Sequence, residues 1–289
     1  MNRESDLADA VAVFDESRPR LFGIAYRMLG SVVEAEDIVS EAWLRWQQTD
    51  RGGIRNPPAY LTTVTTRLAI NTLDSARFTR ESYLGPWLPE PVDTSADPTL
   101  GAETAEALDH AVLVLLESLP SDQRAAYVLR EAFAYDHEQI ADVLSTTAAN
   151  SRQLVSRARK HVGAQRKMPV DPAEHRSLLD AFVAAAQDGD LRRLEEVLAG
   201  DVVSISDGAG IAPRAARRPV IGIDKVARMV AGFADWWIDT TVISVNTNGA
   251  PSAVIRRGNQ TLAVLTISAS PSGIERLHWV MAPDKLTAL

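Results

Sequence analysis

The stretch YDHEQIADVLSTTAANSRQLVSRARKHV, residues 135–162, contains the clearest structural signal in the chain. Its first half predicts a short helix, because Ile140, Val143 and Leu144 fall at helical spacing on one apolar face. Polar residues at 145–147 then predict a turn, and a second periodic segment follows. Two short helices joined by such a turn form a helix-turn-helix.

The second of these helices has the composition of a DNA-reading helix. Between residues 147 and 167 there are six basic residues and no acidic one. Guanidinium and amide groups bind base edges, and cations bind phosphates. The polar residues that this helix presents are Asn150, Arg152, Gln153, Ser156, Arg157, Arg159 and Lys160. A solvated basic helix at the end of a domain is the alternative interpretation.

Positive charge is otherwise local in this chain. The formal net charge is -8, which repels a polyanion at long range. A second basic segment, residues 51–80, has five Arg against Asp74 alone, whereas residues 1–50 have ten acids and five bases. This arrangement suits a protein that contacts DNA at a few places and is held there mainly by another partner.

The 289 residues are enough for two or three domains, and the absence of cysteine excludes a disulfide or a thiolate metal site. No segment has the ~18 consecutive apolar residues of a membrane span, and the N-terminus lacks the pattern of a signal peptide. We therefore expect a cytoplasmic protein without a membrane partner. No metal-ligand spacing or phosphate loop is present, so no cofactor is expected.

Two changes in composition divide the chain. Residues 1–83 show three helical apolar faces, and a proline-rich linker follows at 84–103. Residues 104–167 form a second helical unit that ends in the helix-turn-helix. Residues 172–289 begin with two predicted helices separated by Gly189 and Asp190, after which β-type segments occur at 201–206, 240–246, 252–258, 261–268 and 274–281. This last part predicts an α+β domain with a curved antiparallel sheet.

These segments resemble a known family. RLFGIAYRMLGSVVEAEDIVSEAWLRW (20–46) resembles sigma region 2, which grips core RNA polymerase, and PAYLTTVTTRLAINTLDSARFTRE (58–81) resembles the part that reads the -10 element. The helix-turn-helix is similar to region 4, which reads the -35 element. The short linker resembles that of extracytoplasmic-function sigma factors, in the group with a fused C-terminal SnoaL-like domain. The resemblance implies two all-α sigma domains, the second with the helix-turn-helix, followed by an α+β SnoaL-like domain shaped like a cone.

The resemblance also implies where each partner binds. The expected partners are promoter DNA and core RNA polymerase, through its β′ clamp helices and its β flap. Residues expected to contact polymerase are Asp37, Glu41, Trp43, Leu44 and Arg45. Those expected at the -10 element are Arg55, Arg67, Asn71, Arg77 and Arg80. The alternative for the first set is an ordinary amphipathic helix with Trp43 and Trp46 in its core, and Asn71 could instead be a helix-interior amide bonded to local backbone. The presented residues of the basic helix are assigned to the -35 element.

A regulatory role is implied for the linker and the C-terminal tail. The motif Trp87, Leu88, Pro89, Glu90 and Pro91 and the tail Pro283, Asp284, Lys285 and Leu286 match the group with the fused domain. The group's Asp-Gly-Gly-Gly-Lys stretch occurs only as an altered form that begins at Asp207 and lacks the lysine. We expect the linker and the tail to meet on the SnoaL-like domain, which would regulate the sigma part in cis.

A second class of function remains open, namely an enzyme or a small-molecule-binding domain attached to a DNA-binding module. Relatives of the SnoaL fold use Asp or His for acid–base chemistry in a conical pocket. The candidates here are His175, Asp207, Asp224, Asp239 and His278. Each has an ordinary structural interpretation: Asp207 precedes a turn glycine, Asp224 fits a helix N-cap, and a lone histidine is usually a surface or core group. We therefore expect no catalysis, and an unknown small-molecule ligand stays open as a partner.

Overall fold

The computed structural model of the chain describes residues 3–80, 83–93, 110–165 and 170–287. The chain divides into two compact units, and each is described by itself. The first contains residues 1–79, 98–108 and 112–165, and the second contains 80–97, 109–111 and 166–289. The linker residues 83–93, expected as a separate connecting segment, therefore belong to the same unit as the C-terminal domain.

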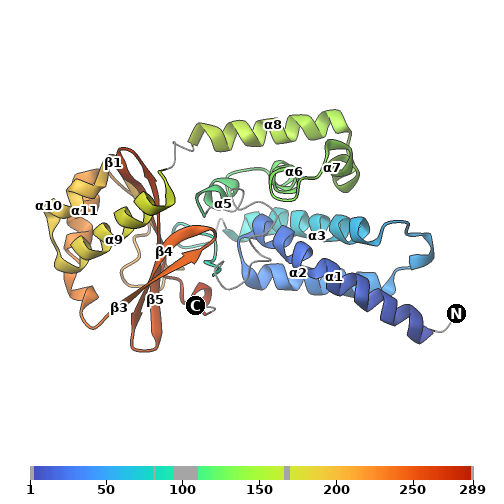
Figure 1. Cartoon of the computed structure of the whole chain (residues 1–289), viewed down its shortest axis with the longest axis horizontal. Helices are drawn as coiled ribbons and strands as arrows, with labels where there is room; N and C mark the ends of the chain where they lie inside the picture. Colours follow the sequence, from blue (N-terminus) through green and yellow to red (C-terminus); the bar gives the residue numbers. More distant parts are fainter. Residues whose placement is uncertain (1–2, 81–82, 94–109, 166–169, 288–289) are drawn as a thin grey trace. The chain divides into compact units, whose positions relative to one another are not determined.

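The first unit is entirely helical in its described residues. Its elements are α1 (Arg3–Leu29), α2 (Val32–Gln48), η1 (Arg51–Gly53), α3 (Pro57–Arg80), α5 (His110–Leu116, whose first two residues belong to the second unit), α6 (Ser121–Glu131), α7 (His137–Leu144) and α8 (Ala148–Gln165) (Figure 1). Gly30, with φ 69°, ends α1 in the left-handed conformation that favours glycine, and the Ser31 side chain caps α2. The buried Trp46 fixes α2 against α1, because its indole nitrogen donates to the Ala10 carbonyl at 3.0 Å.

A buried arginine joins α6 to the end of α1. The Arg124 side chain is buried, and its Nη1 donates to the Met28 carbonyl at 2.6 Å and to Glu117 Oε1 at 2.8 Å. Met28 lies in the last turn of α1, where carbonyl groups have no partner within the helix. Arg124 thus supplies a hydrogen-bond donor to a carbonyl at the end of α1, and Glu117 neutralises its charge.

The helix-turn-helix forms as the sequence predicts. Asp136 starts α7 with a capping box, in which its carboxylate accepts from the backbone of Gln139 and the Gln139 side chain accepts from the Asp136 backbone. Ser145 ends α7 in the left-handed conformation, with φ 52°. Helix α8 then begins at Ala148, and it buries Val155 and Ala158, whereas Leu154 is half-buried.

The second unit is an α+β domain together with the linker segment. Its elements are α9 (Pro172–Asp188), α10 (Leu191–Val197), β1 (Leu198–Asp207), β2 (Val220–Ile221), α11 (Ile223–Ala231), η3 (Ala234–Trp237), β3 (Thr241–Thr247), β4 (Ala250–Arg257), β5 (Gln260–Ser270), β6 (Gly273–Val280) and η4 (Pro283–Lys285). Gly189 ends α9 and the Asp190 side chain caps α10, as the sequence predicts. The helix near Asp224 is also present, but Gly222 is its N-cap and Asp224 lies in its first turn, so the N-cap expectation was wrong.

The strands form one sheet in the order β2-β1-β6-β5-β4-β3. The expectation of a wholly antiparallel sheet was wrong, because β1 pairs with β6 in parallel. Strands β3 to β6 follow one another as hairpins, whereas β1 and β6 are joined through all the intervening elements, and parallel neighbours require such a long connection.

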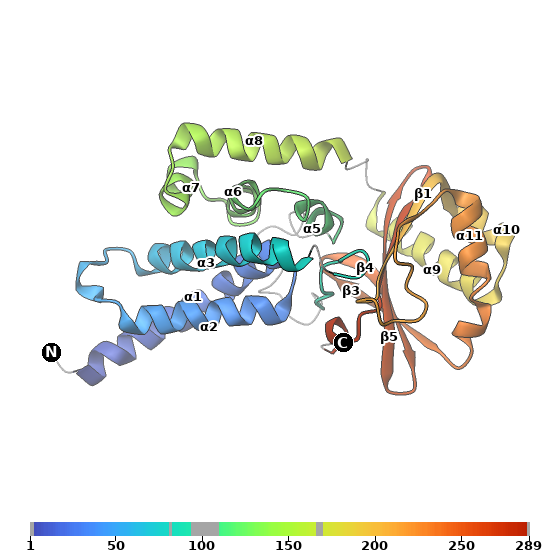
Figure 2. The ribbon, with the colours of Figure 1, turned by 180° about the vertical axis from the view of Figure 1, so that it is seen from behind.

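The two faces of the sheet have different coverings. Side chains alternate along the strands, so Ile255, Leu265 and Leu277 point to one face, where they form a core with α9, α10 and α11 (Figure 2). The other face presents polar side chains, among them Ser252 and Thr266, and these are also buried. Within this unit the linker and the C-terminal tail contact the second face, as described below.

The role of Arg124 predicts a large stability difference between two arginine substitutions. Arg124→Met leaves the Met28 carbonyl and the Glu117 carboxylate without their buried donor, so we expect a loss of about 3 kcal/mol in the unfolding free energy of the first unit. Arg18→Met removes an exposed ion pair with Glu36 at 2.6 Å and should cost about 1 kcal/mol or less. Native-state hydrogen exchange of α1 and α6 amides measures both, and equal losses would contradict the assignment.

Candidate functional site

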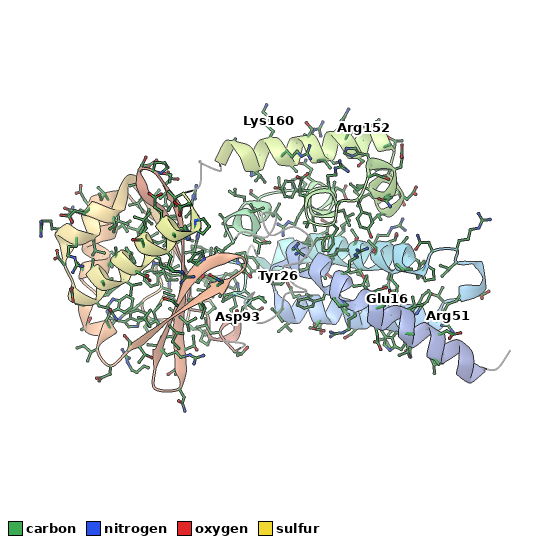
Figure 3. All side chains as sticks on the ribbon, viewed as in Figure 1. Glu16, Tyr26, Arg51, Asp93, Arg152 and Lys160 are labelled. Carbon is green, nitrogen blue, oxygen red and sulfur yellow. The ribbon has the colours of Figure 1, made fainter. Side chains whose placement is uncertain are left out.

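Helix α8 presents an exposed polar and basic face. All seven residues predicted to read DNA are exposed, and Figure 3 shows Arg152 and Lys160 projecting from the outer side of the helix. Among the described residues, two side chains of this set have a polar partner: the Asn150 amide donates to Thr146 Oγ1 at 2.8 Å, and Arg159 forms an ion pair with Glu131 at 2.8 Å. Arg152, Gln153, Ser156, Arg157 and Lys160 therefore project into solvent, where base edges and phosphates could reach them.

The start of α7 lies in a positive local field. The His137 ring lies 3.1 Å from the hydroxyl of the buried Ser151, which ties α7 to α8. The pKa of His137 is lowered from its ordinary value by burial first, and then by Arg130, Arg152 and Arg159. The cations of the helix-turn-helix are thus close enough to disfavour another positive charge, and the same field favours an anion.

Three of the five residues predicted for the -10 element have described side chains, and all three are exposed. Arg55 and Asn71 are exposed, whereas the side chains of Arg77 and Arg80 lie outside the described residues. Arg67 has a protein partner instead of a free path to phosphate: its Nε donates to the Val143 carbonyl at 3.0 Å, and its Nη2 donates to Ser145 Oγ at 2.5 Å. Arg67 therefore binds the last carbonyls of α7, which is the first helix of the helix-turn-helix.

The residues predicted to contact polymerase lie along α2. Asp37, Leu44 and Arg45 are exposed, and the Arg45 side chain pairs with half-buried Glu41 at 2.9 Å. Trp43 is half-buried and packs against the ring of Phe14 on α1, with ring centroids 4.9 Å apart. The charged members and Leu44 thus form the accessible face, and Trp43 supports it from beneath.

Asp207 forms the centre of a buried polar cluster in the second unit. Its carboxylate accepts from the Tyr83 hydroxyl at 2.6 Å, from the Leu88 backbone at 2.8 Å and from Lys285 Nζ at 2.7 Å. Lys285 also donates to the Leu88 carbonyl at 2.6 Å and lies 3.9 Å from the centre of the Trp87 ring. Asp207 was expected in a turn before Gly208, but it lies fully buried at the end of β1. We call Tyr83, Trp87, Leu88, Asp207 and Lys285 the carboxylate clasp.

The carboxylate clasp brings together three distant parts of the sequence. The linker motif, the end of β1 and the tail after β6 all meet at one carboxylate, and Leu88, Pro89, Glu90, Pro91 and Leu286 are buried around them. Burial, followed by the bond to Asp207, raises the pKa of Tyr83 far above its ordinary value. A lysine is thus present beside Asp207, but it comes from the tail and not from the altered glycine stretch, where Ile211 is exposed.

Asn248 makes contacts that the sequence analysis did not predict. Asn248 lies in the β3–β4 turn with φ 49°, and it is buried. Its backbone donates to the Val92 carbonyl at 2.9 Å, and its side chain accepts from the Val92 backbone at 3.1 Å and donates to the Glu90 carbonyl at 3.1 Å. The backbone of His110 in turn donates to the Asn248 carbonyl at 3.1 Å. An Asn-Gly pair signals a hairpin turn, but no local pattern signals that the turn binds a distant segment.

The candidate catalytic residues do not converge on one place. His175 lies on α9 with its Nε2 3.0 Å from the Ile267 carbonyl, and Ile267 faces the helices. Asp224 and Asp239 are exposed, whereas Asp207 is neutralised within the carboxylate clasp. His278 is buried on β6, on the opposite face of the sheet from Trp279. No pair among them has the geometry of an acid and a base acting on one substrate.

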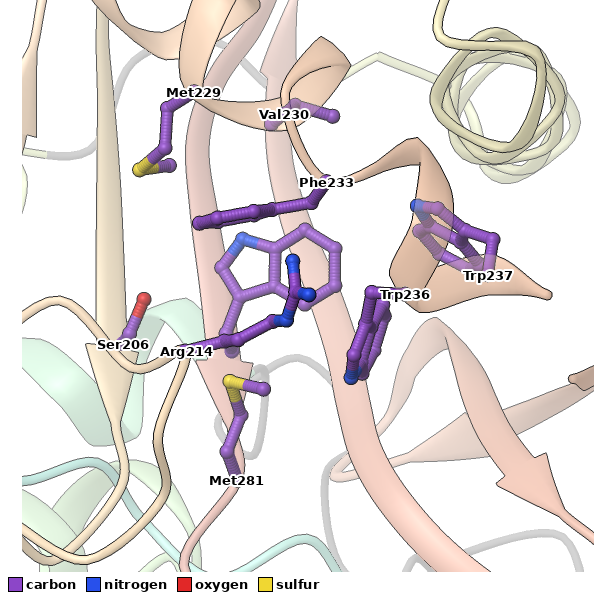
Figure 4. A pocket seen from close by; sticks show the side chains of 9 residues that line it. Ser206, Arg214, Met229, Val230, Phe233, Trp236, Trp237 and Met281 are labelled. Carbon is purple, nitrogen blue, oxygen red and sulfur yellow. The ribbon is translucent and has the colours of Figure 1, made fainter.

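An aromatic pocket lies on the helix-covered face (Figure 4). Its cavity is about 30 Å³, which is room for little more than water, because tryptophan and methionine side chains occupy the rest. Arg214 at this pocket already forms two bonds with Asp235, at 3.2 and 2.9 Å. The side chains that line it are Ser206, Arg214, Met229, Val230, Phe233, Trp236, Trp237, Trp279 and Met281. None of them is a carboxylate, so the pocket does not supply the pair of acids that the enzyme interpretation requires.

In the described part of the chain, no group of three or more His, Cys, Asp or Glu side chains could hold a metal ion. None of the described helices is long and apolar enough to cross a membrane.

Comparisons with known proteins agree with this geometry. Residues 13–79 match the model of Sigma-70 region 2, and residues 109–162 match that of Sigma-70 region 4. The chain is 45% identical over 229 residues to the ECF RNA polymerase sigma factor SigJ of Mycobacterium tuberculosis, a match that covers 77% of this chain and 72% of the relative. It is 31% identical over 284 residues to the probable ECF RNA polymerase sigma factor SigI of that organism, covering 96% of this chain and 95% of the relative.

A solved structure supports the fold over nearly the whole chain. The crystal structure of the Mycobacterium tuberculosis extracytoplasmic function sigma factor SigJ aligns with a TM-score of 0.76 and 36% identity, covering 96% of this chain and 98% of the other. The predicted fold class, two helical sigma domains followed by an α+β SnoaL-like domain, is thereby confirmed. This chain belongs to the ECF family of RNA polymerase sigma factors.

Proposed function

We propose that this sigma factor reads the -35 element with the exposed face of α8 and the -10 element with α3 and the loop before it. The observation that carries the proposal is α8 itself, which follows a capped α7 and exposes five polar residues without protein partners among the described residues. A helix of this kind reaches base edges in the major groove, while its cations bind the phosphates on either side.

Core polymerase supplies the rest of the binding. The proposed contact for the β′ clamp helices is the accessible face of α2, which contains Asp37, Glu41, Leu44 and Arg45. The exposed apolar Leu44 beside the Glu41–Arg45 ion pair suits a protein interface. Region 4 is the proposed contact for the β flap. The net negative charge of the chain keeps its affinity for DNA alone low. Polymerase brings the two basic segments, residues 51–80 and 147–167, to the promoter.

The C-terminal domain is proposed to regulate these contacts in cis. Two observations support this. The carboxylate clasp holds the linker that joins the sigma regions, and Arg67 of the -10 set is bound to the end of α7. A protein in this state must release both interactions before α3 and α8 can take the spacing that a promoter requires. Polymerase or a signal molecule can shift the equilibrium toward the released form only by as much as it binds the released form more tightly than the held form.

The domain is proposed to act without catalysis. Its candidate acids and histidines are dispersed, and the aromatic pocket has no carboxylate in its lining. The pocket favours binding of a small apolar molecule over chemistry on it, if one of the tryptophan side chains moves aside. Pocket residue Ser206 directly precedes Asp207, so a ligand there would act one residue from the carboxylate clasp.

The first functional prediction concerns dependence on polymerase. The chain should direct purified core polymerase to start at specific sequences within a randomised promoter library, and it should bind the selected promoters weakly without polymerase because its net charge is -8. In vitro transcription and a binding titration with the free protein measure the two halves. Tight, sequence-specific binding by the free protein would contradict the proposal.

Substitutions on α8 should separate base contacts from phosphate contacts. Alanine at Arg152 or Arg157, if that residue binds a guanine edge, should cost roughly 1–3 kcal/mol and relax the preference at one -35 position. Lys160→Ala should weaken binding to all sequences about equally and reduce the salt dependence. A competition assay with the polymerase holoenzyme on single-base promoter variants measures both effects. A base-specific defect at Lys160 would show that another side of α8 faces the bases.

Substitution of Lys285 should release the linker. Lys285→Met leaves the buried Asp207 carboxylate without its cation, which destabilises such a pair by about 3–5 kcal/mol. The amide of Leu88 should then exchange much faster, and transcription with core polymerase should start at a lower protein concentration. Lys225→Met, at an exposed position of α11, is the matched control and should change neither. Faster exchange at Leu88 without altered transcription would separate the structural role of the clasp from a regulatory one.

A further inference from the structure

A row of buried polar side chains crosses the linker-covered face of the sheet. Ser252, Thr266 and His278 are register partners on β4, β5 and β6. The hydroxyl of Thr247 lies 2.6 Å from that of Ser252, which lies 3.0 Å from that of Thr266. The chain of hydroxyls satisfies its members, and His278 is the next residue of the row.

His278 differs from the rest of the row in having no hydrogen bond. Its side chain is 1% exposed, and neither ring nitrogen has a partner among the residues that the structure describes. Its closest aromatic neighbour is the ring of His110, with centroids 5.1 Å apart. Buried polar atoms are normally bonded, so an imidazole in this position calls for a physical role.

The contact between the His110 and His278 rings is stable only while His278 is neutral. Burial lowers the pKa of His278 well below its ordinary value of 6.5, and His110 from α5 and Arg276 from β6 lower it further. Further charged groups on this face include Lys285 and Asp207, which are paired with one another, the buried Glu90 of the linker, Asp93, whose backbone bridges Thr247, and Asp284 near Tyr83. A proton on His278 would thus be placed beside a second imidazole and a guanidinium, with no hydrogen bond to stabilise it.

Asn248 contacts both His110 and the linker. The Asn248 amide is oriented by its bonds to Val92 and Glu90, so its Nδ2 presents a hydrogen to His110 Nδ1 at 3.4 Å. A proton on that ring nitrogen would set two donors against each other. Asn248 therefore binds residues 90–92 on one side and His110 on the other, which are the described ends of the segment that joins the two sigma regions.

The position of His110 gives this arrangement its consequence. His110 is the first residue of α5, which lies at the start of the segment that matches region 4, and it belongs to the same compact unit as the sheet. The C-terminal domain thus holds the linker at both ends, at the carboxylate clasp and at Asn248. We call Glu90, Val92, His110, Asn248 and His278 the histidine clasp.

We propose that the histidine clasp is an acid-sensitive release, in which a proton taken up at His278 expels His110 and frees both ends of the linker from the β3–β4 turn. The inference rests on the proposed regulation in cis only for its biological meaning. Release itself is a structural event that can be measured without polymerase or promoter.

The sign of the pH dependence follows from the neutral folded state. A released His278 regains an ordinary pKa near 6.5 and binds more protons than the clasped one below that value. The clasp is therefore fully formed above about pH 6.5 and loses stability as the pH falls. One histidine shifts the equilibrium toward release by up to about tenfold for each pH unit below 6.5.

Hydrogen exchange of the full chain at pH 7.5 and 5.5 tests the proposal. After correction for the intrinsic pH dependence of exchange, the protection of the Val92 and His110 amides should fall about tenfold at pH 5.5. The amides of β5, which are bonded within the sheet, should keep their protection. Unchanged protection at Val92 and His110, or a loss of protection in β5 at the same pH, would overturn the proposal.

Three variants locate the proton. His278→Phe keeps a ring without a titrating group and should reduce the pH response of Val92 and His110 to less than threefold. Asn248→Gly keeps the left-handed backbone and removes the amide, so release should already be raised at pH 7.5. His175→Gln, on the opposite face of the sheet, is the matched control and should respond as the unmodified chain does. A full response in His278→Phe, or its absence in His175→Gln, would contradict the assignment to His278.

Discussion

The buried carboxylate of Asp207 is the constraint on which the second unit depends. A fully buried charge is tolerated only when a cation and hydrogen-bond donors surround it. The residues just after β1 supply one weak bond, from the Ala209 backbone at 3.3 Å, so the remaining donors must come from elsewhere. They come from the linker and from the tail, which is why segments distant in the sequence are ordered at one place.

This constraint explains why the linker belongs to the C-terminal unit although it joins the two sigma regions. Prolines in Trp87–Pro91 lack backbone donors, so the linker offers only a few amides, and those of Leu88 and Val92 are both bound by the C-terminal domain. The sheet face beneath is polar and buried. The linker segments and His110 cover this face, as the helices cover the other one. The linker therefore acts as part of the fold of the domain.

Local patterns in the sequence predicted the elements well. The apolar spacing of 135–162 and the Gly189–Asp190 pair led directly to helices whose caps the structure shows. The partners of single residues were harder to predict, because they depend on long-range contacts. Asp207 precedes a glycine, which is typical of an exposed turn, but tertiary burial overrides that local preference. Arg67 is exposed on α3, but sequence spacing could not show that the end of α7 lies against it.

The parallel pairing of β1 with β6 has a consequence for synthesis of the protein. Strand β6 and Lys285 are made after the sigma regions and after the other five strands, so neither the complete sheet nor the carboxylate clasp can close before they have been synthesised. About 120 residues separate the end of α8 at Gln165 from Lys285, which is about 6–24 s at ~5–20 residues per second. During each round of synthesis the sigma regions thus exist for several seconds on the ribosome before the domain that holds their linker has formed. Any restraint that this domain exerts must be established afterwards, on sigma regions that have already been synthesised.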